Sequence, residues 1–289
     1  MRVAAAAYPL TPFQSWAEYG AKLEHWVADA AGADLLVFPE YGAMELAAIS
    51  GAAGGLEASL KAVDALVPQV DALHAQLAEK YGAHILAASA PVFMGERPVN
   101  RARLFAPNGT MAAQDKQIMT RFERETWDVA PGDPLRIIDT VLGKIGVLIC
   151  YDAEFPLLAR ALVSAGADIL LVPSCTDTRH GWNRVRIGAA ARALENQCVA
   201  IQAVTVGESQ WCAGVDENHG AACVFGPPDA GFPEDGVIAM STMDQPGWTF
   251  AEIDPGAIAH VRTQGAQHNL AHWDEQPPGD AALHHVTLR

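Results

Sequence analysis

A glutamate, a lysine and a cysteine each stand at the end of a short run that has the character of a β-strand. Glu40 follows residues 34–39, Lys116 follows the second strand of a predicted hairpin, and Cys150 follows residues 143–149. Side chains at the ends of neighbouring strands can converge on one site. An unperturbed thiol, with a pKa of about 8.5, is mostly protonated at neutral pH, so a nucleophilic cysteine needs a base or a positive neighbour. Glu40 could accept the proton, and Lys116 could stabilise negative charge.

Each of these residues also has a structural interpretation when it is taken alone. Glu40, directly after Pro39, could be a carboxylate near the start of a helix. Lys116 could be a solvated turn lysine, and Cys150 could be a small buried hydrophobic residue. The functional interpretation therefore depends on the combination.

The elements that must position these residues alternate along the chain. Apolar runs predict strands, and apolar residues at helical spacing predict helices, including a long one that we expect to be interrupted at Pro68. Pro107-Asn108-Gly109 predicts the turn of a hairpin. The predicted strands cover 3–8, 34–39, 84–89, 101–106, 111–115, 135–139, 143–149, 168–173, 199–204, 222–225, 236–241 and 248–253, and the predicted helices 16–30, 56–81, 156–165 and 182–197. This alternation predicts an α/β layered fold with chemistry at the carboxyl ends of strands.

Composition narrows the class of protein. The chain has 289 residues, 50% hydrophobic and 18% charged, which indicates a globular protein with a large core. No linker or repeat divides it, so we expect one domain over residues 1–289. With 19 Lys+Arg against 34 Asp+Glu, the formal charge is −15, which argues against nucleic acid or an anionic membrane as a partner.

The cysteines and histidines give no sign of a disulfide framework or a metal site. The five cysteines are widely spaced, form no CxxC pair and are odd in number, and the ten histidines show no ligand spacing. The apolar start of the chain is broken at Pro9, too early for a signal-peptide core, and no run is long enough to span a membrane. We therefore expect a cytoplasmic protein in a reducing compartment, with no bound metal.

Several ordered motifs resemble the carbon–nitrogen hydrolase (nitrilase) superfamily. They are Phe38-Pro39-Glu40-Tyr41, Asp115-Lys116, Pro131-Gly132-Asp133, the segment 146–156 with Cys150-Tyr151-Asp152 at its centre, and Arg192-Ala193-Leu194-Glu195-Asn196. The resemblance runs from Val3 to about Ile253. It implies a four-layer αββα sandwich, a Glu-Lys-Cys triad, no cofactor, and a homodimer or a higher homo-oligomer.

The resemblance also implies a role for each motif residue. Cys150 would be the nucleophile, Glu40 the general base and later acid, and Lys116 a stabiliser of the oxyanion together with the backbone N–H of Tyr151. The family carries a second glutamate between the lysine and the cysteine. Both Glu123 and Glu125 are candidates, and counting back from Pro131-Gly132 favours Glu125 as the residue that holds Lys116 and orients substrate. The other glutamate would pair with Arg121 or Arg124 on the surface.

The substrate side of the site is predicted from the residues around the nucleophile. Cys-Tyr-Asp followed by Phe-Pro resembles the amidase branches, whereas true nitrilases carry Cys-Trp-Glu, so we expect a small-molecule amide. Cys175 and Trp182 are candidates to line the pocket, although Trp182 could instead pack at a helix start. If Glu154 faces the pocket, it would repel a carboxylate, which favours a neutral or cationic amide or an N-carbamoyl amine.

Other functions remain open from the sequence. The same triad could serve an N-carbamoyl amine hydrolase, a nitrilase or a thiol-dependent acyltransferase, and the fold could serve a scaffold without catalysis. The segment from about 264 to 289 is polar and lacks apolar periodicity. By resemblance we expect it to reach across a subunit interface.

Overall fold

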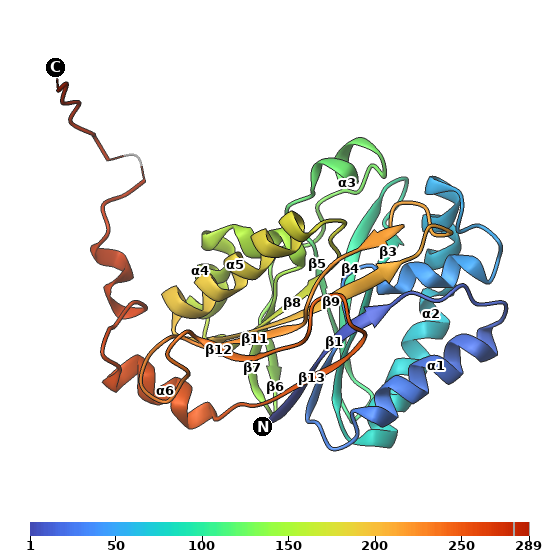
Figure 1. Cartoon of the computed structure of the whole chain (residues 1–289), viewed down its shortest axis with the longest axis horizontal. Helices are drawn as coiled ribbons and strands as arrows, with labels where there is room; N and C mark the ends of the chain where they lie inside the picture. Colours follow the sequence, from blue (N-terminus) through green and yellow to red (C-terminus); the bar gives the residue numbers. More distant parts are fainter. Residues whose placement is uncertain (280, 289) are drawn as a thin grey trace.

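The computed structural model describes residues 1–279 and 281–288, and in them thirteen strands form one hydrogen-bonded sheet (Figure 1). Its main path has the order β5-β4-β3-β2-β1-β9-β8-β7-β6. The strands are β1 (Arg2–Pro9), β2 (Leu35–Val37), β3 (His84–Phe93), β4 (Pro98–Phe105), β5 (Met111–Asp115), β6 (Ile138–Thr140), β7 (Gly143–Val147), β8 (Ile169–Ser174), β9 (Val199–Glu208), β10 (Glu217–Asn218), β11 (Cys223–Phe225), β12 (Val237–Met240) and β13 (Gly247–Glu252).

Helices lie between and beside the strands. The α-helices are α1 (Trp16–Asp29), α2 (Leu56–Tyr81), α3 (Arg121–Glu125), α4 (Pro156–Ser164), α5 (Arg179–Asn196) and α6 (Pro255–Gln264), and the 3₁₀ helices are η1 (Gly42–Ala48), η2 (Cys150–Glu154) and η3 (Ala271–Glu275). Several begin with side-chain caps, such as Ser15 at α1 and Thr178 at α5.

Strand β1 forms the centre because both of its faces are apolar. Its alternate residues Val3, Ala5 and Ala7 belong to one core cluster, and Ala4, Ala6 and Tyr8 to the other. It pairs in parallel with β2 and β9 and antiparallel with β13. A strand buried on both faces reads as a continuous apolar run, which is why the sequence signal is strong here.

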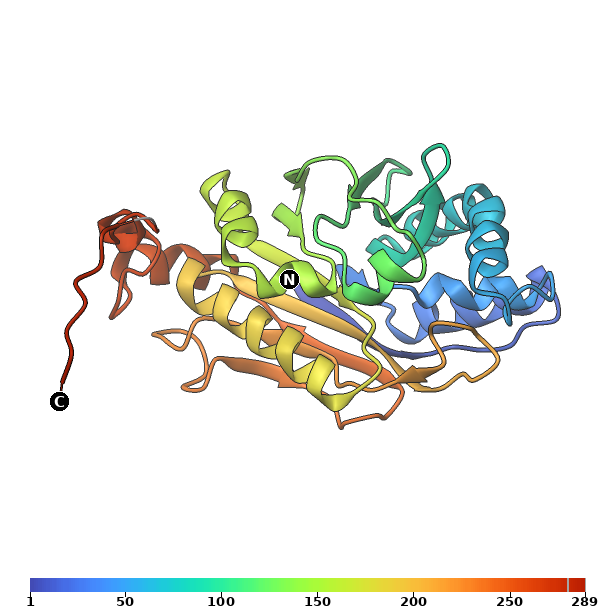
Figure 2. The same ribbon diagram turned by 90° about the horizontal axis from the view of Figure 1, so that it is seen from above.

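The two core clusters define the layers. Helices α1 and α2 bury their apolar sides against one cluster, and α4 and α5 bury theirs against the other. The two helix pairs therefore lie on opposite outer sides of the strands (Figures 1 and 2). The predicted α/β class and αββα layering are confirmed.

Most predicted elements appear near their expected bounds, including the hairpin of β4 and β5, which pair antiparallel from Arg101 with Asp115 to Phe105 with Met111. The predicted interruption at Pro68 is wrong, since α2 is one helix of 26 residues with Pro68 inside it. The proline is exposed, and buried residues on both sides of it, such as Val63 and Val70, continue one apolar stripe. Burial of that stripe outweighs the local cost of the proline.

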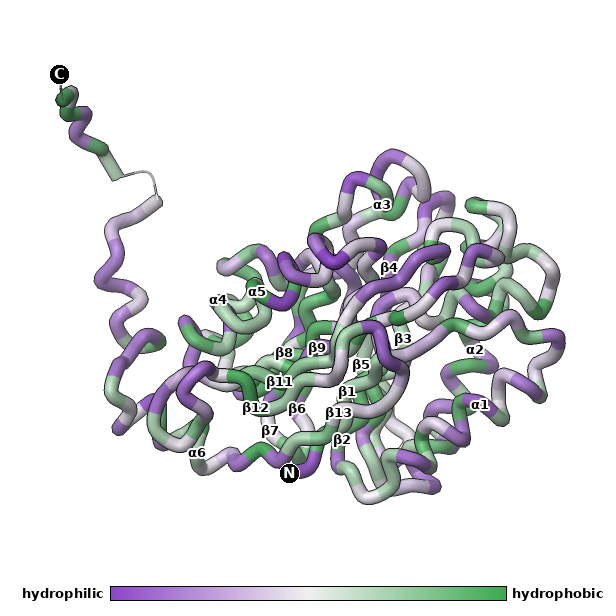
Figure 3. Tube along the Cα trace, viewed as in Figure 1, coloured by the Kyte–Doolittle hydropathy of each residue, from purple (hydrophilic) through white to green (hydrophobic). Residues whose placement is uncertain are grey.

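The segment after α6, from residue 265, runs beside α4 and α5 and then extends away from the rest of the molecule (Figures 1 and 2). Gln197 ties it down by donating to the carbonyl of Gln267 and accepting from the amide of Leu270, and Arg160 lies over the ring of Trp273. The central strands are mainly apolar in colour, whereas hydrophilic residues gather in peripheral loops and in this segment (Figure 3). Within the described ranges, no helix is long and apolar enough to cross a membrane.

Candidate active site

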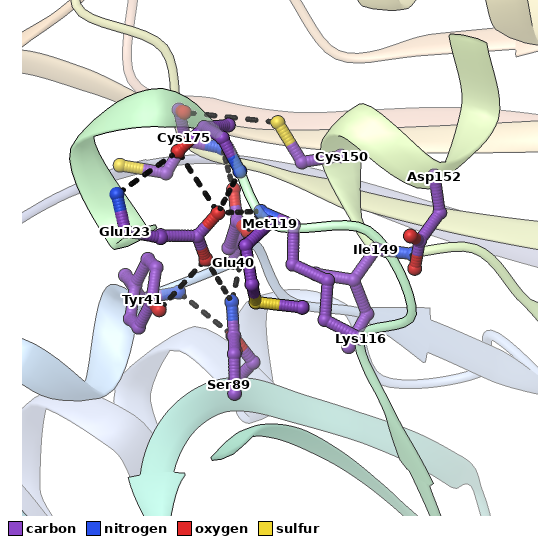
Figure 4. A network of polar contacts seen from close by, with 12 residues as sticks. Glu40, Tyr41, Ser89, Lys116, Met119, Glu123, Ile149, Cys150, Asp152 and Cys175 are labelled. Carbon is purple, nitrogen blue, oxygen red and sulfur yellow. Dashed lines mark hydrogen bonds and ion pairs between the residues drawn. The ribbon is translucent and has the colours of Figure 1, made fainter. Parts of the chain in front are cut away.

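Glu40, Lys116 and Cys150 meet although their strands are spread across the sheet. Glu40 follows β2, Lys116 follows β5 at one end of the strand order, and Cys150 follows β7 near the other end. They come together because the sheet folds into two facing layers. Figure 4 shows the three side chains gathered in one network of polar contacts. All three are buried, with exposed fractions of 1% for Glu40 and Lys116 and 4% for Cys150.

The lysine and the glutamate form a direct ion pair. Lys116 Nζ donates to Glu40 Oε1 at 2.7 Å. The other oxygen of Glu40, Oε2, accepts the backbone N–H of Cys175 at 3.0 Å. Both oxygens of Glu40 are therefore engaged by donors, which fixes the plane of the carboxylate.

The thiol of Cys150 donates to the carbonyl oxygen of Cys175 at 3.8 Å (Figure 4). Because the backbone N–H of the same Cys175 donates to Glu40 Oε2, the cysteine and the glutamate contact one shared residue. Cys150 is the first residue of η2 and has a φ of +50°, the left-handed conformation that a non-glycine residue seldom adopts. Such a backbone costs free energy and persists where the surrounding structure imposes it, as often happens at functional sites.

Glu123, and not Glu125, is the second glutamate at the lysine. Lys116 Nζ donates to Glu123 Oε2 at 2.7 Å, and Glu123 is buried. Glu125 is exposed and pairs with Arg121 at 3.0 Å. The prediction that Glu125 holds Lys116 is therefore wrong, and the surface pairing expected for the other glutamate belongs to Glu125.

A capping box explains why Glu123 points inward. The hydroxyl of Thr120 accepts the N–H of Glu123, while Glu123 Oε2 accepts both the N–H and the hydroxyl of Thr120 at 2.9 Å. The pattern Thr120-x-x-Glu123 is the sequence signature of such a box. It is the signal that would have favoured Glu123, because an N3 glutamate folds back over the helix start.

Further polar side chains surround the two carboxylates. Tyr41 donates its hydroxyl to Glu123 Oε1 at 2.9 Å. Asn100 Nδ2 donates to Glu40 Oε1 at 2.9 Å and lies 3.4 Å from Glu123 Oε1. Ser89 donates its hydroxyl to Asn100 Oδ1 at 2.6 Å. Tyr41 appears in the sequence analysis only as part of the Glu40 motif. Ser89 and Asn100 were not predicted as site residues, because β3 and β4 bring them to the site.

The electrostatics of the cluster follow from burial and from these partners. Burial raises the pKa of Glu40, although the Lys116 ammonium opposes it. Burial acts in the same direction on Glu123, but Lys116 and the hydrogen bonds from Thr120 and Tyr41 hold the pKa of Glu123 below its usual value. Burial works against the charge on Lys116, yet the two carboxylates raise its pKa well above the ordinary range.

The surroundings of Cys150 favour the protonated thiol over the thiolate. Burial and the negative charge of Glu40 raise the pKa of the Cys150 thiol well above its ordinary value. The site therefore holds a protonated thiol beside a carboxylate. Such a pair can form a sulfur nucleophile only as the proton moves to the base during attack.

Asp152 joins the lysine loop to the cysteine loop. Its Oδ1 accepts the N–H of Ile118 at 2.8 Å, and its Oδ2 accepts the N–H of Ile149 at 3.2 Å. The N–H of Gln117 lies 3.2 Å from both oxygens. Burial raises the pKa of this carboxyl to about 7, against the opposing effect of Lys116 and of the backbone donors. The side chain is separate from the Glu40 cluster and sits beside Ile149 (Figure 4).

The other predicted pocket residues contribute unequally. Cys175 contributes backbone groups to Glu40 and Cys150, while its thiol turns to Asn218 Oδ1 at 3.5 Å. Tyr151 is half-buried in η2 with its ring against Phe155. Its backbone N–H belongs to the first turn of η2, where helices leave such donors unpaired.

Glu154 and Trp182 were predicted to face the substrate, and the contacts of their side chains do not support that role. Glu154 pairs with Arg184 at 3.5 Å, so its charge is matched and the expected repulsion of a substrate carboxylate loses its basis. Trp182 is buried in the core, and its indole N–H donates to the carbonyl of Ala221 at 3.0 Å. Packing at the start of α5 is the role that the structure shows for Trp182, and substrate binding by this side chain is not supported.

Within residues 1–279 and 281–288, no group of three or more His, Cys, Asp or Glu side chains is arranged to hold a metal ion. A layered α/β fold that gathers a buried carboxylate, an ammonium and a thiol around the backbone of Cys175 defines a cysteine-based site of hydrolase type.

Comparison with known proteins agrees with this class. The family model described as "Carbon-nitrogen hydrolase" matches residues 2–262, so this chain belongs to the carbon–nitrogen hydrolase family. The chain is 30% identical over 272 residues to a probable hydrolase, YhcX, of Bacillus subtilis, covering 93% of this chain and 53% of that protein. It is 31% identical over 202 residues to a deaminated glutathione amidase of Synechocystis, covering 65% of this chain and 70% of that protein.

Among solved structures, a glutamate-to-glutamine mutant of an amidase from Nesterenkonia sp. AN1 superposes with a TM-score of 0.65 at 23% identity, covering 96% of this chain and all of that one. That structure shows the product of Michael addition of acrylamide at the active-site cysteine. At this identity the likeness concerns the fold. The chain also spans only about half the length of YhcX, the first of these relatives.

Proposed function

We propose that this protein hydrolyses the C–N bond of a small linear amide through a thioester on Cys150. The observation that carries the proposal is the convergence of three buried side chains. Glu40 pairs with Lys116 at 2.7 Å, and the backbone of Cys175 contacts both Glu40 and the Cys150 thiol. A base, a cation and a nucleophile gathered in one buried cluster are the minimum for acyl transfer by a protonated cysteine.

The first half of the reaction forms the thioester. The Cys150 sulfur attacks the amide carbonyl carbon while its proton passes to Glu40. The Lys116 ammonium and the backbone N–H of Tyr151 stabilise the oxyanion. A donor of this type contributes about 3–4 kcal/mol in other hydrolases. When the tetrahedral intermediate collapses, the C–N bond breaks and Glu40 returns the proton to the departing nitrogen, which leaves as ammonia or an amine.

The second half releases the acid. Water attacks the thioester carbonyl as Glu40 takes its proton, and the C–S bond then breaks. The sulfur recovers a proton from Glu40, and a carboxylic acid leaves. Glu40 is base and acid in turn, which requires that it be neither held permanently ionised nor permanently protonated. The opposing effects of burial and Lys116 on its pKa suit that requirement.

The relatives support an amide as the substrate class. One is described as a deaminated glutathione amidase, and the Nesterenkonia protein as an amidase whose active-site cysteine adds acrylamide. In this chain the corresponding chemistry would fall to Cys150. Because Arg184 matches the charge of Glu154, the substrate screen includes neutral, anionic and cationic amides.

A substrate screen tests the proposal. Neutral, anionic and cationic amides, N-carbamoyl amines and nitriles are incubated with enzyme, and released ammonia is measured with Cys150→Ala as the blank. Intact mass measurement after rapid quenching should show an acyl adduct that is absent from Cys150→Ala. Turnover by Cys150→Ala at the wild-type rate would contradict the nucleophile assignment. Turnover of nitriles in preference to all amides would contradict the substrate class.

We also propose that the protein acts as a homodimer or a higher homo-oligomer. Large apolar side chains are exposed on neighbouring helices, with exposed fractions of 70% for Leu157 on α4 and 58% for Ile187 on α5. Such residues suit a surface that is covered by a second copy. Light scattering should give a multiple of the monomer mass for the wild type and a lower mass for Ile187→Asp. A monomeric wild type would contradict this proposal.

A further inference from the structure

The two carboxylates at the site outnumber their cation. Glu40 and Glu123 are both buried, and Lys116 is the only ammonium that contacts them in the described residues. If both are ionised, the cluster carries an excess negative charge in a poorly solvated place. Neutral hydrogen-bond donors must then supply part of the stabilisation that water would give.

Asn100 is the side-chain amide that reaches both carboxylates. Its Nδ2 lies 2.9 Å from Glu40 Oε1 and 3.4 Å from Glu123 Oε1. Asn100 is fully buried on β4, and its own backbone carbonyl accepts the N–H of Lys116 at 2.9 Å. The residue therefore contacts all three charged members of the cluster.

The orientation of the Asn100 amide is fixed by a directional chain of hydrogen bonds. The backbone N–H of Tyr41 donates to Ser89 Oγ at 3.0 Å. The Ser89 hydroxyl proton is then free to point at Asn100, which it meets at 2.6 Å. A donated proton requires an acceptor, so the carbonyl end of the amide faces Ser89 and the NH₂ end faces the carboxylates.

We infer that Asn100 is a positioning residue that stabilises the ionised forms of Glu40 and Glu123. Ser89 orients the Asn100 amide so that its NH₂ group faces these two carboxylates. The inference rests on the proposed function, because it concerns the base of that reaction. Without Asn100, Glu40 would be protonated over a wider pH range and less able to take the thiol proton.

The charged and titratable groups that face Glu40 determine how its pKa changes when Asn100 is removed. They are Lys116 from the end of β5, Glu123 from α3, Cys150 from η2, Cys175 from the loop after β8, and Tyr41 beside it in the chain. Removal of Asn100 leaves all of them in place. It takes from Glu40 a donor at 2.9 Å, whereas its longer contact to Glu123, at 3.4 Å, is backed there by Lys116, Thr120 and Tyr41. Glu123 therefore stays ionised and continues to repel negative charge on Glu40, and the loss of the direct hydrogen bond raises the pKa of Glu40.

The experiment follows alkylation of Cys150 by iodoacetamide, which needs no substrate. The sulfur–carbon bond forms, iodide leaves, and the thiol proton passes to Glu40 and then to solvent. The rate is measured by peptide mass at pH values from 4 to 9. We expect an acid limb, a fall in rate where Glu40 becomes protonated, and Glu40→Gln should remove it.

Asn100→Leu, which keeps the approximate shape of the side chain, should move this limb upward by about one pH unit, the size expected for one hydrogen bond to a charged group. Ser89→Ala should move it in the same direction by a smaller amount. Asn196→Leu is the matched control, since Asn196 is equally buried but donates to Arg192 within α5. It should leave the limb in place.

The outcomes separate this inference from the proposed function. A limb that stays at its wild-type position in a folded Asn100→Leu overturns the inference, as does a wild type without a limb that depends on Glu40. If circular dichroism shows that Asn100→Leu does not fold, Ser89→Ala decides, and an unshifted limb overturns the inference. Failure to hydrolyse any amide overturns the proposed function but leaves the alkylation result standing.

Discussion

Glu123 lies as close to Lys116 as Glu40 does, with 2.7 Å from its Oε2 to the lysine Nζ. The lysine is thereby held between two carboxylates from different elements, one after β2 and one on α3. A buried ammonium with two such partners stays charged and has little freedom to move. This relationship makes Glu123 part of the machinery that positions Lys116.

Glu123→Gln should therefore lower kcat/KM by about tenfold or more, because Lys116 keeps Glu40 but loses one of its two charged hydrogen bonds, which is worth about 1.5–3 kcal/mol. Glu125→Gln is the matched control two residues away, because Glu125 is exposed and contacts only Arg121 among charged groups in the described chain. It should change kcat/KM by less than about twofold. Steady-state kinetics on the substrate found in the screen decide between them. A larger fall in kcat/KM for Glu125→Gln than for Glu123→Gln would contradict this assignment and indicate that Glu125 acts at the site.

Asp152→Asn should impair catalysis without removing any group that contacts the reacting atoms. Both oxygens of Asp152 accept backbone N–H groups, from Ile118 on one side and Ile149 on the other. An amide replaces one acceptor with a donor and leaves an N–H unpaired, at a cost of about 1–3 kcal/mol. We expect kcat to fall by about tenfold or more with a smaller change in KM.

Asp229→Asn is the control for Asp152→Asn. Asp229 also accepts three backbone N–H groups, from Ala230, Ala266 and Gln267, but it lies between β11 and β12 and links that loop to the segment after α6. Its replacement should leave kcat unchanged. Equal losses in the two variants would show that general loosening of the fold, and not the link between the two loops, explains the effect.

His74 should make the protein less stable in mild acid. It is buried on α2, its ring stacks on Phe105, and burial lowers its pKa from 6.5 to about 4. Between these values the unfolded chain binds a proton that the folded chain does not, so stability present above pH 6.5 is lost as the pH falls. From pH 7 to pH 5 this group should cost about 2 kcal/mol.

Urea unfolding of wild type and His74→Phe at pH 7 and pH 5 measures this contribution. The variant keeps an aromatic ring against Phe105 and cannot titrate. It should lose about 2 kcal/mol less than the wild type between the two pH values, whatever its stability at pH 7. An identical pH dependence in the two proteins would mean that His74 is protonated in the folded state.

Pro68→Ala should stabilise the protein, because Pro68 lies on the exposed side of the interior of α2. Proline costs about 3 kcal/mol inside a helix, and its stiffening of the unfolded chain returns up to about 1 kcal/mol. A gain of about 1–2 kcal/mol in the free energy of unfolding is expected. Pro156→Ala is the control, since Pro156 occupies the first turn of α4, where proline is favourable. It should not stabilise, and a gain in both variants would exclude the helix-interior explanation.

The elements were predictable where local pattern and burial agree. Strands such as β1 and β8 are apolar on both faces, so their signal is a plain apolar run. Pro68 shows the limit of a local rule, since the proline signal is real but the apolar stripe of α2 is stronger. At Glu123 a local signal was present in the capping box with Thr120, and distance along the chain from Pro131-Gly132 was a poorer guide than helix geometry.

Periodicity and side-chain chemistry are properties of neighbours in the chain. The alternation of strands and helices, and the residue types at the ends of β2, β5 and β7, were therefore predictable from the amino-acid sequence. The folded arrangement was needed to establish that Arg184 matches Glu154 and that Asn100 and Ser89 complete the cluster. Each of these contacts joins residues from separate elements. Their distances depend on how the sheet folds over and how the helices pack, and no local pattern comparable to the capping box of Glu123 encodes that geometry.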